Sequence, residues 1–166
     1  LVPKPYITAD YASHNGMNGD NINDIYVDGG DRIWLANYPA GVTIRNNRYQ
    51  SYEWFRHSPG NSRSLVNDQV HDVIEDSEGD LWFATSNGIS LLQPAVGRWR
   101  SFLSRSDGIQ DGGNHIFLTL CEVSPGVICA GGYASGLYRI EKNTGRVEYV
   151  PPSVAAEERP DQDIND

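Results

Sequence analysis

The 166-residue sequence predicts an all-β protein built from one repeated four-stranded unit. Similar stretches occur at three places in the chain: Asp20 to Ile44, Asp68 to Leu92 and, in degraded form, Asn114 to Ile140. Corresponding apolar positions follow one another at steps of 48 and 46 residues: Ile22, Val70 and Ile116. Gly and Pro interrupt every window in which a helix would need apolar residues at 3.6-residue spacing. These observations favour strands and argue against a helical repeat.

The middle unit shows the predicted order of elements. Strands are expected at 70–76, 81–85, 89–92 and 98–103, with turns at 77–80, 86–88 and 94–97. The first strand is rich in β-branched residues, and Gly79 can supply a positive φ to the first turn. Four antiparallel strands in 46 to 48 residues match the size of a β-propeller blade. The sequence therefore predicts a β-propeller fragment of about three blades, with partial blades at both ends.

The repeat divides the chain into blades and connections. We expect blade repeats at 20–57, 68–103 and 114–150, inter-blade loops at 58–67 and 104–113, the end of a preceding blade with its loop at 1–19, and a loop with the start of the next blade at 151–166. Known propellers have at least four blades, so a three-blade fragment leaves apolar faces and strand edges open. We therefore expect the chain to belong to a longer propeller or to self-associate, for instance as a homodimer.

Aromatic and glycine positions recur within the units. Trp34 and Trp82 lie in apolar strands, and we expect them to pack between neighbouring blades rather than to stack on a sugar. The third unit departs from this pattern, because Ile128 aligns with the tryptophans. Glycines occur at the second turn of each unit: Gly41, Gly88 and Gly136.

Aspartates end the first strand of two units, just before a glycine-containing turn. We expect the side chains of Asp28 and Asp76 to bond the backbone of their own turns, and the alignment places Glu122 at this position in the third unit. Calcium binding by Asp76, Glu78 and Asp80 is the alternative, but it needs several converging oxygens. The four histidines share no metal-ligand spacing, so no metal site and no cofactor are expected.

The pattern Val-Ile-Glu-Asp-Ser-x-Gly-x-Leu-Trp-Phe-Ala-Thr-x-x-Gly-Ile, which ends at Ile89, resembles the two-component regulator propeller repeat. The stretch from Ile22 to Val42 is similar to the same repeat, with its aspartate, tryptophan and glycine in place. The resemblance extends over about residues 17–150. Two good copies of the Asp-x-x-Gly-x-x-Trp core at a 48-residue step make it specific.

This resemblance implies a setting and a role. Such repeats typically form the periplasmic sensor region of Bacteroidetes hybrid two-component histidine kinases, anchored in the inner membrane, and their ligands are mostly oligosaccharides. The expected function is therefore extracytoplasmic sensing of an oligosaccharide, with signalling to a kinase elsewhere in the full-length chain. A scaffold propeller that binds a protein without a small ligand is the alternative, and a lyase or hydrolase propeller is a more distant one.

Composition limits the other classes of function. The formal net charge of −9 weighs against nucleic acid, whose phosphates need a basic surface. No run of 18 apolar residues is present, so this segment is not expected to contact the membrane. The sequence contains no Gly-x-Ser-x-Gly motif and no phosphate-binding loop, and we expect no catalytic residues in this segment.

Ligand-binding residues are expected where the second and third strands of each blade are joined. In a propeller these turns and the inter-blade loops share one face, and aromatic and amide side chains there suit a neutral sugar. The candidates are Tyr38, Asn87 and Tyr133.

Two cysteines flank the turn at Ser124 to Gly126. If the hairpin is symmetric about Pro125, Cys121 and Cys129 face each other. Directly opposed Cβ atoms lie about 4.5–5.5 Å apart, wider than the roughly 3.8 Å usual in a disulfide. Two buried free thiols are the expected state, and a disulfide is the alternative that an oxidising periplasm permits.

Overall fold

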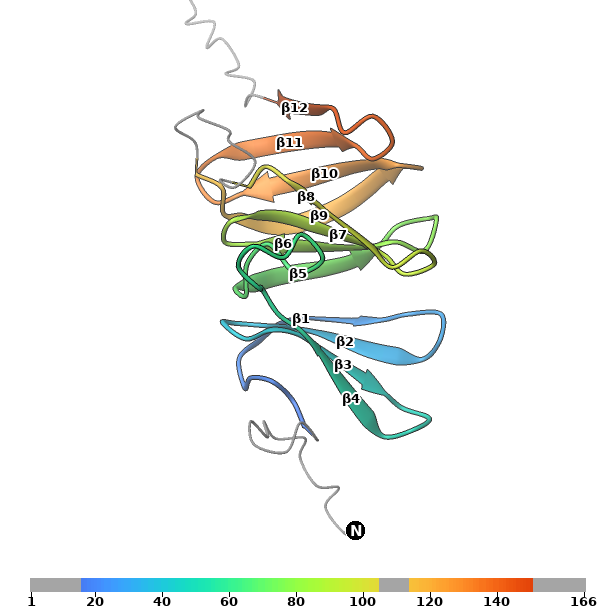
Figure 1. Ribbon diagram of the computed structural model, residues 1–166. Helices are drawn as coiled ribbons and strands as arrows, with labels where there is room; N and C mark the ends of the chain where they lie inside the picture. Colours follow the sequence, from blue (N-terminus) through green and yellow to red (C-terminus); the bar gives the residue numbers. More distant parts are fainter. Residues whose placement is uncertain (1–15, 105–113, 151–166) are drawn as a thin grey trace, which may run out of the picture.

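The computed structural model describes residues 16–104 and 114–150, and these form three four-stranded antiparallel sheets (Figure 1). The first sheet comprises β1 (Ile22–Val27), β2 (Arg32–Asn37), β3 (Gly41–Asn46) and β4 (Ser51–Phe55). The second comprises β5 (Val70–Glu75), β6 (Leu81–Thr85), β7 (Gly88–Gln93) and β8 (Arg98–Phe102). The third comprises β9 (Phe117–Ser124), β10 (Val127–Gly132), β11 (Gly136–Glu141) and β12 (Val147–Val150). The predicted all-β architecture of three antiparallel blades is confirmed.

The sheets, called blades 1 to 3 below, lie one above the other like layers (Figure 1). Within each sheet the strands pair in sequence order, and β5 contacts both β1 and β9. Turns join the successive strands of each blade at two opposite ends of the sheet. We call the end with the β2–β3, β6–β7 and β10–β11 turns and the 56–69 connection the loop face, and the other end the turn face. No helix in the described residues has the length and apolar character needed to cross a membrane.

Two hydrophobic clusters hold the blades together, one at each interface. Trp34 belongs to the cluster between blades 1 and 2, and Trp82 to the cluster between blades 2 and 3. Their side chains are 1% and 0% exposed, so each tryptophan packs against the following blade, as predicted. Phe83, the neighbour of Trp82 on β6, points the other way and packs in the first cluster. Because successive side chains point to opposite faces of a strand, β6 contributes a side chain to each of the two interfaces.

The third blade differs from the predicted alignment by one position. Cys129, not Ile128, is the counterpart of Trp82. Counted from the β-ladder pair next to the second turn of its own blade, Cys129 lies three pairs along, and so does Trp82. Ile128 therefore faces blade 2 and lies in the cluster with Trp82. The expected equivalence of Ile128 with the tryptophans is wrong, because a one-residue shift moves a strand side chain to the opposite face.

The same shift reassigns Glu122. Glu122 pairs with Ile128 as Glu75 pairs with Leu81, so it is the counterpart of Glu75 and not of Asp76. Both glutamates reach back to the preceding blade. Glu75 accepts a 2.5 Å hydrogen bond from the Tyr26 hydroxyl, and Glu122 accepts a 2.7 Å bond from the Ser77 amide.

A recurring link joins the innermost strands of adjacent blades. The β-ladder register shifts between Ile22 and Asp24 and again between Val70 and Asp72. Asp24 accepts a 3.1 Å hydrogen bond from the Val73 amide, and one blade further along Asp72 accepts a 2.6 Å bond from the Leu120 amide. Each bulge places the carboxylate where the backbone of the next blade needs an acceptor. Burial, together with the nearby Asp24, raises the pKa of Asp72.

The repeated glycines fix the start of the third strand of each blade. Gly41, Gly88 and Gly136 have φ of 81°, 100° and 81°, the left-handed region that disfavours other residues. The Gly41 amide donates to the carbonyl of Asp68 at 2.7 Å, and the Gly88 amide donates to that of His115 at 2.8 Å. A Cβ on Gly88 would lie 2.8 Å from the Phe102 carbonyl oxygen. Gly41 and Gly88 thus tie blades 1 and 2 to the connections that lead into the following blades.

Candidate functional site

On the turn face, the aspartate of the repeat organises its own turn. Asp28 accepts hydrogen bonds from the amides of Gly30 and Arg32 at 2.9 and 3.0 Å. Asp76 accepts equivalent bonds from the amides of Glu78 and Asp80 at 3.0 and 2.9 Å. The predicted side-chain-to-backbone turns are therefore present in both blades.

The repeat tryptophan has a second role that the sequence analysis missed. The indole N–H of Trp34 donates to Asp28 at 2.8 Å, and that of Trp82 donates to Asp76 at 2.8 Å. The tryptophan thus packs its ring in the blade interface and satisfies its one polar atom on the turn carboxylate. The constant spacing of six residues between aspartate and tryptophan was the available signal.

Lys142 of blade 3 occupies the centre of an acidic cluster on blade 2. Its ammonium lies 2.6 Å from Asp76, 2.8 Å from Glu78 and 2.7 Å from Asp80, and the lysine side chain is 2% exposed. Burial acts to lower the pKa of Lys142, but the hydrogen bonds to the three carboxylates raise it well above its usual range. Burial likewise acts against ionisation of Asp76, while the bonds from Lys142 and Trp82 hold the pKa of Asp76 below its usual value.

A lysine side chain occupies the place that the calcium alternative assigns to a metal ion. The oxygens of Asp76, Glu78 and Asp80 do converge, but the cation between them is the Lys142 ammonium. Within residues 16–104 and 114–150, no group of three or more histidine, cysteine or acidic side chains could hold a metal ion. In blade 1 the corresponding Asp28 is paired at 2.7 Å with Arg32 of its own turn.

On the loop face, Tyr38 borders a polar hollow of about 500 Å³. The hollow is lined by two segments of the chain, residues 18–21 and 38–40, and by two further residues, Arg56 and Asp68. The Tyr38 side chain is 36% exposed, and its ring lies 5.7 Å from that of His71 on blade 2. A tyrosine face beside amide, guanidinium and carboxylate groups can stack on one side of a sugar ring and hydrogen-bond its hydroxyls.

His71 joins the edge of this region to the second blade. Its Nε2 lies 2.8 Å from the Ser86 hydroxyl, and its Nδ1 lies 3.4 Å from the Asn23 amide. Burial lowers the pKa of His71, so the imidazole is held neutral near pH 7. The His71 imidazole therefore lies beside Tyr38 as an uncharged ring.

The other two predicted ligand residues lie on different blades. Asn87 is half-buried in the β6–β7 turn, where its backbone N–H donates to the Thr85 hydroxyl at 3.2 Å. Tyr133 is 58% exposed in the β10–β11 turn. Among the described residues, neither one lines the hollow at Tyr38. The structure thus places the three candidates on the same face, and of the three only Tyr38 lines the 500 Å³ hollow.

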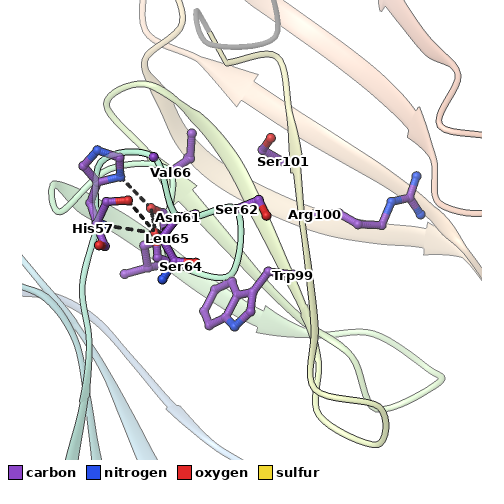
Figure 2. A pocket seen from close by; sticks show the side chains of 11 residues that line it. His57, Asn61, Ser62, Ser64, Leu65, Val66, Trp99, Arg100 and Ser101 are labelled. Atoms are coloured by element: carbon purple, nitrogen blue, oxygen red, sulfur yellow. Dashed lines mark hydrogen bonds between the residues drawn. The ribbon is translucent and has the colours of Figure 1, made fainter.

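A second hollow, of about 440 Å³, lies between the 57–66 segment and the outer strand β8 (Figure 2). Figure 2 shows Trp99 at one end of the hollow and Ser101 beside Val66 at the other. The remaining lining includes hydroxyl and amide side chains from Ser58, Ser62 and Asn61. Among the described residues, no aspartate or glutamate lines this hollow, although the chain has 22 acidic residues. No motif in the sequence indicated this cavity.

The cysteines face each other, as the hairpin geometry predicted. Cys121 pairs with Cys129 across β9 and β10, and both are free thiols. The expectation that they are buried is wrong: Cys121 is exposed and Cys129 is half-buried. They lie on the face of blade 3 that points away from blade 2, at the positions of Ile74 and Trp82, which pack in the cluster between blades 2 and 3.

Comparison with known proteins supports the repeat and the fold. Residues 64–87 match the family described as "Two component regulator propeller". The structure is similar to the extracellular domain of the hybrid two component system BT3049 from B. thetaiotaomicron, with a TM-score of 0.75 and 22% identity over 89% of this chain and 20% of that chain. It is also similar to that of BT4673 from the same organism, with a TM-score of 0.64 and 21% identity over 92% of this chain and 19% of that chain. No curated protein matches the chain.

A further similarity, at 13% identity and a TM-score of 0.53, is to YCF48 bound to D1 peptide, over 77% of this chain and 39% of that chain. The chain spans about a fifth of the length of the two hybrid-system domains. Residues 64–87 are therefore similar to a two component regulator propeller repeat, and the fold is that of these extracellular domains.

Proposed function

We propose, from the two component regulator propeller repeat at 64–87, that this chain is part of the extracytoplasmic ligand-sensing propeller of a hybrid two-component sensor kinase. The proposed location is the periplasm, as part of a protein anchored in the inner membrane. Signalling would pass to a histidine kinase elsewhere in the full-length protein. We propose no catalytic step for this segment.

The proposed ligand is an oligosaccharide, bound at the loop face. The observation that carries this proposal is the polar hollow at Tyr38, where an exposed aromatic ring lies beside amide, guanidinium and carboxylate side chains. The hollow contains one arginine and two aspartates, Asp20 and Asp68, so it suits an uncharged sugar better than a sulfated or uronic one.

A thermal-shift screen against plant and host oligosaccharides tests this function. A ligand at a hundred times its dissociation constant stabilises the folded state by about 2.7 kcal/mol, which raises Tm by roughly 5–11 °C for a chain of this size. One glycan class should raise Tm, and Tyr38→Ala should abolish the rise. Tyr49→Ala is the matched control, because Tyr49 is 69% exposed and lies in the β3–β4 turn on the opposite face. A flat screen with a well-folded protein would contradict the proposal.

Binding of a protein segment is the second candidate. The similarity to a propeller solved in complex with a peptide favours it. A flat sugar screen combined with saturable binding of a partner polypeptide at the loop face would support this function instead.

We also propose self-association of the isolated chain. Ile25 and Val27 on the innermost strand of blade 1 are 59% and 53% exposed, on the side away from blade 2. Light scattering at micromolar concentration should show a species larger than 18.4 kDa, and a monodisperse monomer would contradict the proposal.

A further inference from the structure

The segment that leads into each blade has the same structure in blades 1 and 2. Residues 16–22 and 64–70 follow the same sequence of bends and bridges. The backbone N–H of Asn18 donates to the Thr43 hydroxyl at 3.0 Å, and the backbone N–H of Val66 donates to the Ser90 hydroxyl at 2.9 Å. These matching bonds make Asn18 the counterpart of Val66, and hence Gly16 the counterpart of Ser64.

In blade 1 an indole covers this segment. Trp54 on β4 lies directly opposite Thr43 in the β-ladder, and its N–H donates to the Gly16 carbonyl at 3.0 Å. The guanidinium of Arg56 lies 5.8 Å from the centre of the Trp54 ring. Under this cover Asn18 is 0% exposed.

In blade 2 the equivalent side chain is missing. Ser101 on β8 lies opposite Ser90, as Trp54 lies opposite Thr43. Ser101 is exposed, and Val66 beneath it is only half-buried. The 440 Å³ hollow therefore opens at the position that Trp54 fills in blade 1 (Figure 2). Its volume is within the range of small-molecule pockets.

The walls of the hollow are held in place by hydrogen bonds within the protein. The Ser64 hydroxyl bonds the carbonyl of Asn61 at 2.9 Å, and His57 bonds the carbonyl of Leu65 at 2.8 Å. Trp99 packs edge-on to Phe55, with ring centres 5.2 Å apart, and stacks on Phe83 at 6.0 Å. A cavity with fixed walls does not need to be reorganised when a ligand enters, which favours binding.

We propose that this hollow binds a planar aromatic ring that carries a hydrogen-bond donor, such as an indole or a phenol. The ring would lie over Val66 beside Trp99, and its N–H or O–H would donate to the Ser64 carbonyl, the counterpart of the Gly16 carbonyl that Trp54 uses. The ring can come from a free small molecule or from the side chain of a bound peptide. This assignment concerns a different cavity from the one at Tyr38 and does not depend on the sensor role.

The test is titration of the 166-residue chain with indole and, separately, with the blocked tripeptide N-acetyl-Gly-Trp-Gly-amide, followed by ligand-observed NMR and calorimetry. We expect saturable binding of indole at one site per chain. Ser101→Trp, which supplies the ring in place, should weaken that binding at least tenfold and raise Tm. Ser101→Thr is the control, because it keeps the hydroxyl and leaves most of the hollow open; it should bind indole within twofold of the original chain.

The outcomes separate the sources of the ring. Equal affinity for indole and tripeptide would assign recognition to the ring alone, and a much tighter tripeptide would assign it to a peptide-borne side chain. Either result supports the proposal if Ser101→Trp abolishes it. Indole binding that survives Ser101→Trp unchanged, or no binding of either probe, would overturn it. Trp54→Ser gives an independent check, since a folded variant should bind two indoles.

Discussion

Replacement of Lys142 by alanine should destabilise the fold more than any other single change of charge among the described residues. The ammonium is paired with three carboxylates, and two of them are nearly inaccessible: the Asp76 side chain is 0% exposed and that of Asp80 is 9% exposed. Removing one partner of a buried ion pair costs about 3–5 kcal/mol, because the remaining charges stay buried without a counter-ion. Glu78 is 54% exposed and contributes little, since water can solvate it.

For a chain of this size that loss lowers Tm by roughly 6–20 °C. The measurement is thermal and urea unfolding of the original chain and of Lys142→Ala at pH 7. Arg139→Ala is the control, because its ion pair with Glu141 is solvent-accessible, with side chains 37% and 29% exposed, and should change Tm little. Asp80→Asn placed in the Lys142→Ala background should recover part of the loss.

The sign of the pH dependence of the unfolding free energy can be predicted for the original chain and for Lys142→Ala. In the original chain the pKa of Asp76 is lowered on folding, so its contribution is present above pH 4 and is lost as the pH falls through the folded-state value. In Lys142→Ala the carboxylate of Asp76 loses its cation, and its folded-state pKa rises because the ion pair no longer offsets burial. Unfolding free energy should then increase as the pH falls from 7 toward 5. A Lys142→Ala variant with unchanged Tm and an unchanged pH slope would refute the electrostatic account.

Three further predictions concern the repeat and the thiols. Trp82→Phe should cost about 2–4 kcal/mol in urea unfolding, because the ring shrinks and the buried Asp76 loses a donor; a loss below 1 kcal/mol would contradict the role of the indole N–H. Gly88→Ala should destabilise by about 2 kcal/mol or more, whereas Gly97→Ala, also at positive φ but with open space around its Cβ position, should cost roughly 1 kcal/mol; equal losses would argue against the backbone clash. Titration with a thiol reagent should count two free thiols in the denatured, unreduced chain, and none would indicate the cross-strand disulfide instead.

The repeat made most of the fold predictable. A 48-residue step and the Asp-x-x-Gly-x-x-Trp core were enough to place blades 1 and 2, because the core residues bond one another within a single turn. The third blade lacks both the aspartate and the tryptophan, so its register could not be read from the repeat core. The alignment then placed Ile128 one position out, and in a strand one position is the difference between the two faces.

The cavities were predictable only in part. Tyr38 could be placed on the loop face from the order of strands alone, but the hollow beside it also depends on Arg56 and Asp68, which come from the connection to the next blade. The hollow at β8 was not accessible to sequence reasoning. The hollow is open because blade 2 has a serine, Ser101, at the position that Trp54 occupies in blade 1. This equivalence becomes visible only when the strand registers of the two blades are compared.

The carboxylate link between bulged inner strands has a consequence for how such arrays can change. Asp24 and Asp72 each fix the height of the next blade along the common axis, because a blade that slid by one residue would take its bulge amide out of reach of the carboxylate. Blades 1 and 2 therefore contact the following blade through equivalent aspartates. A duplicated or exchanged blade would pack with the same alignment along the axis. Thr119 occupies this position in blade 3, so the series of equivalent aspartates ends there, and a unit added beyond blade 3 would have to be aligned by other contacts.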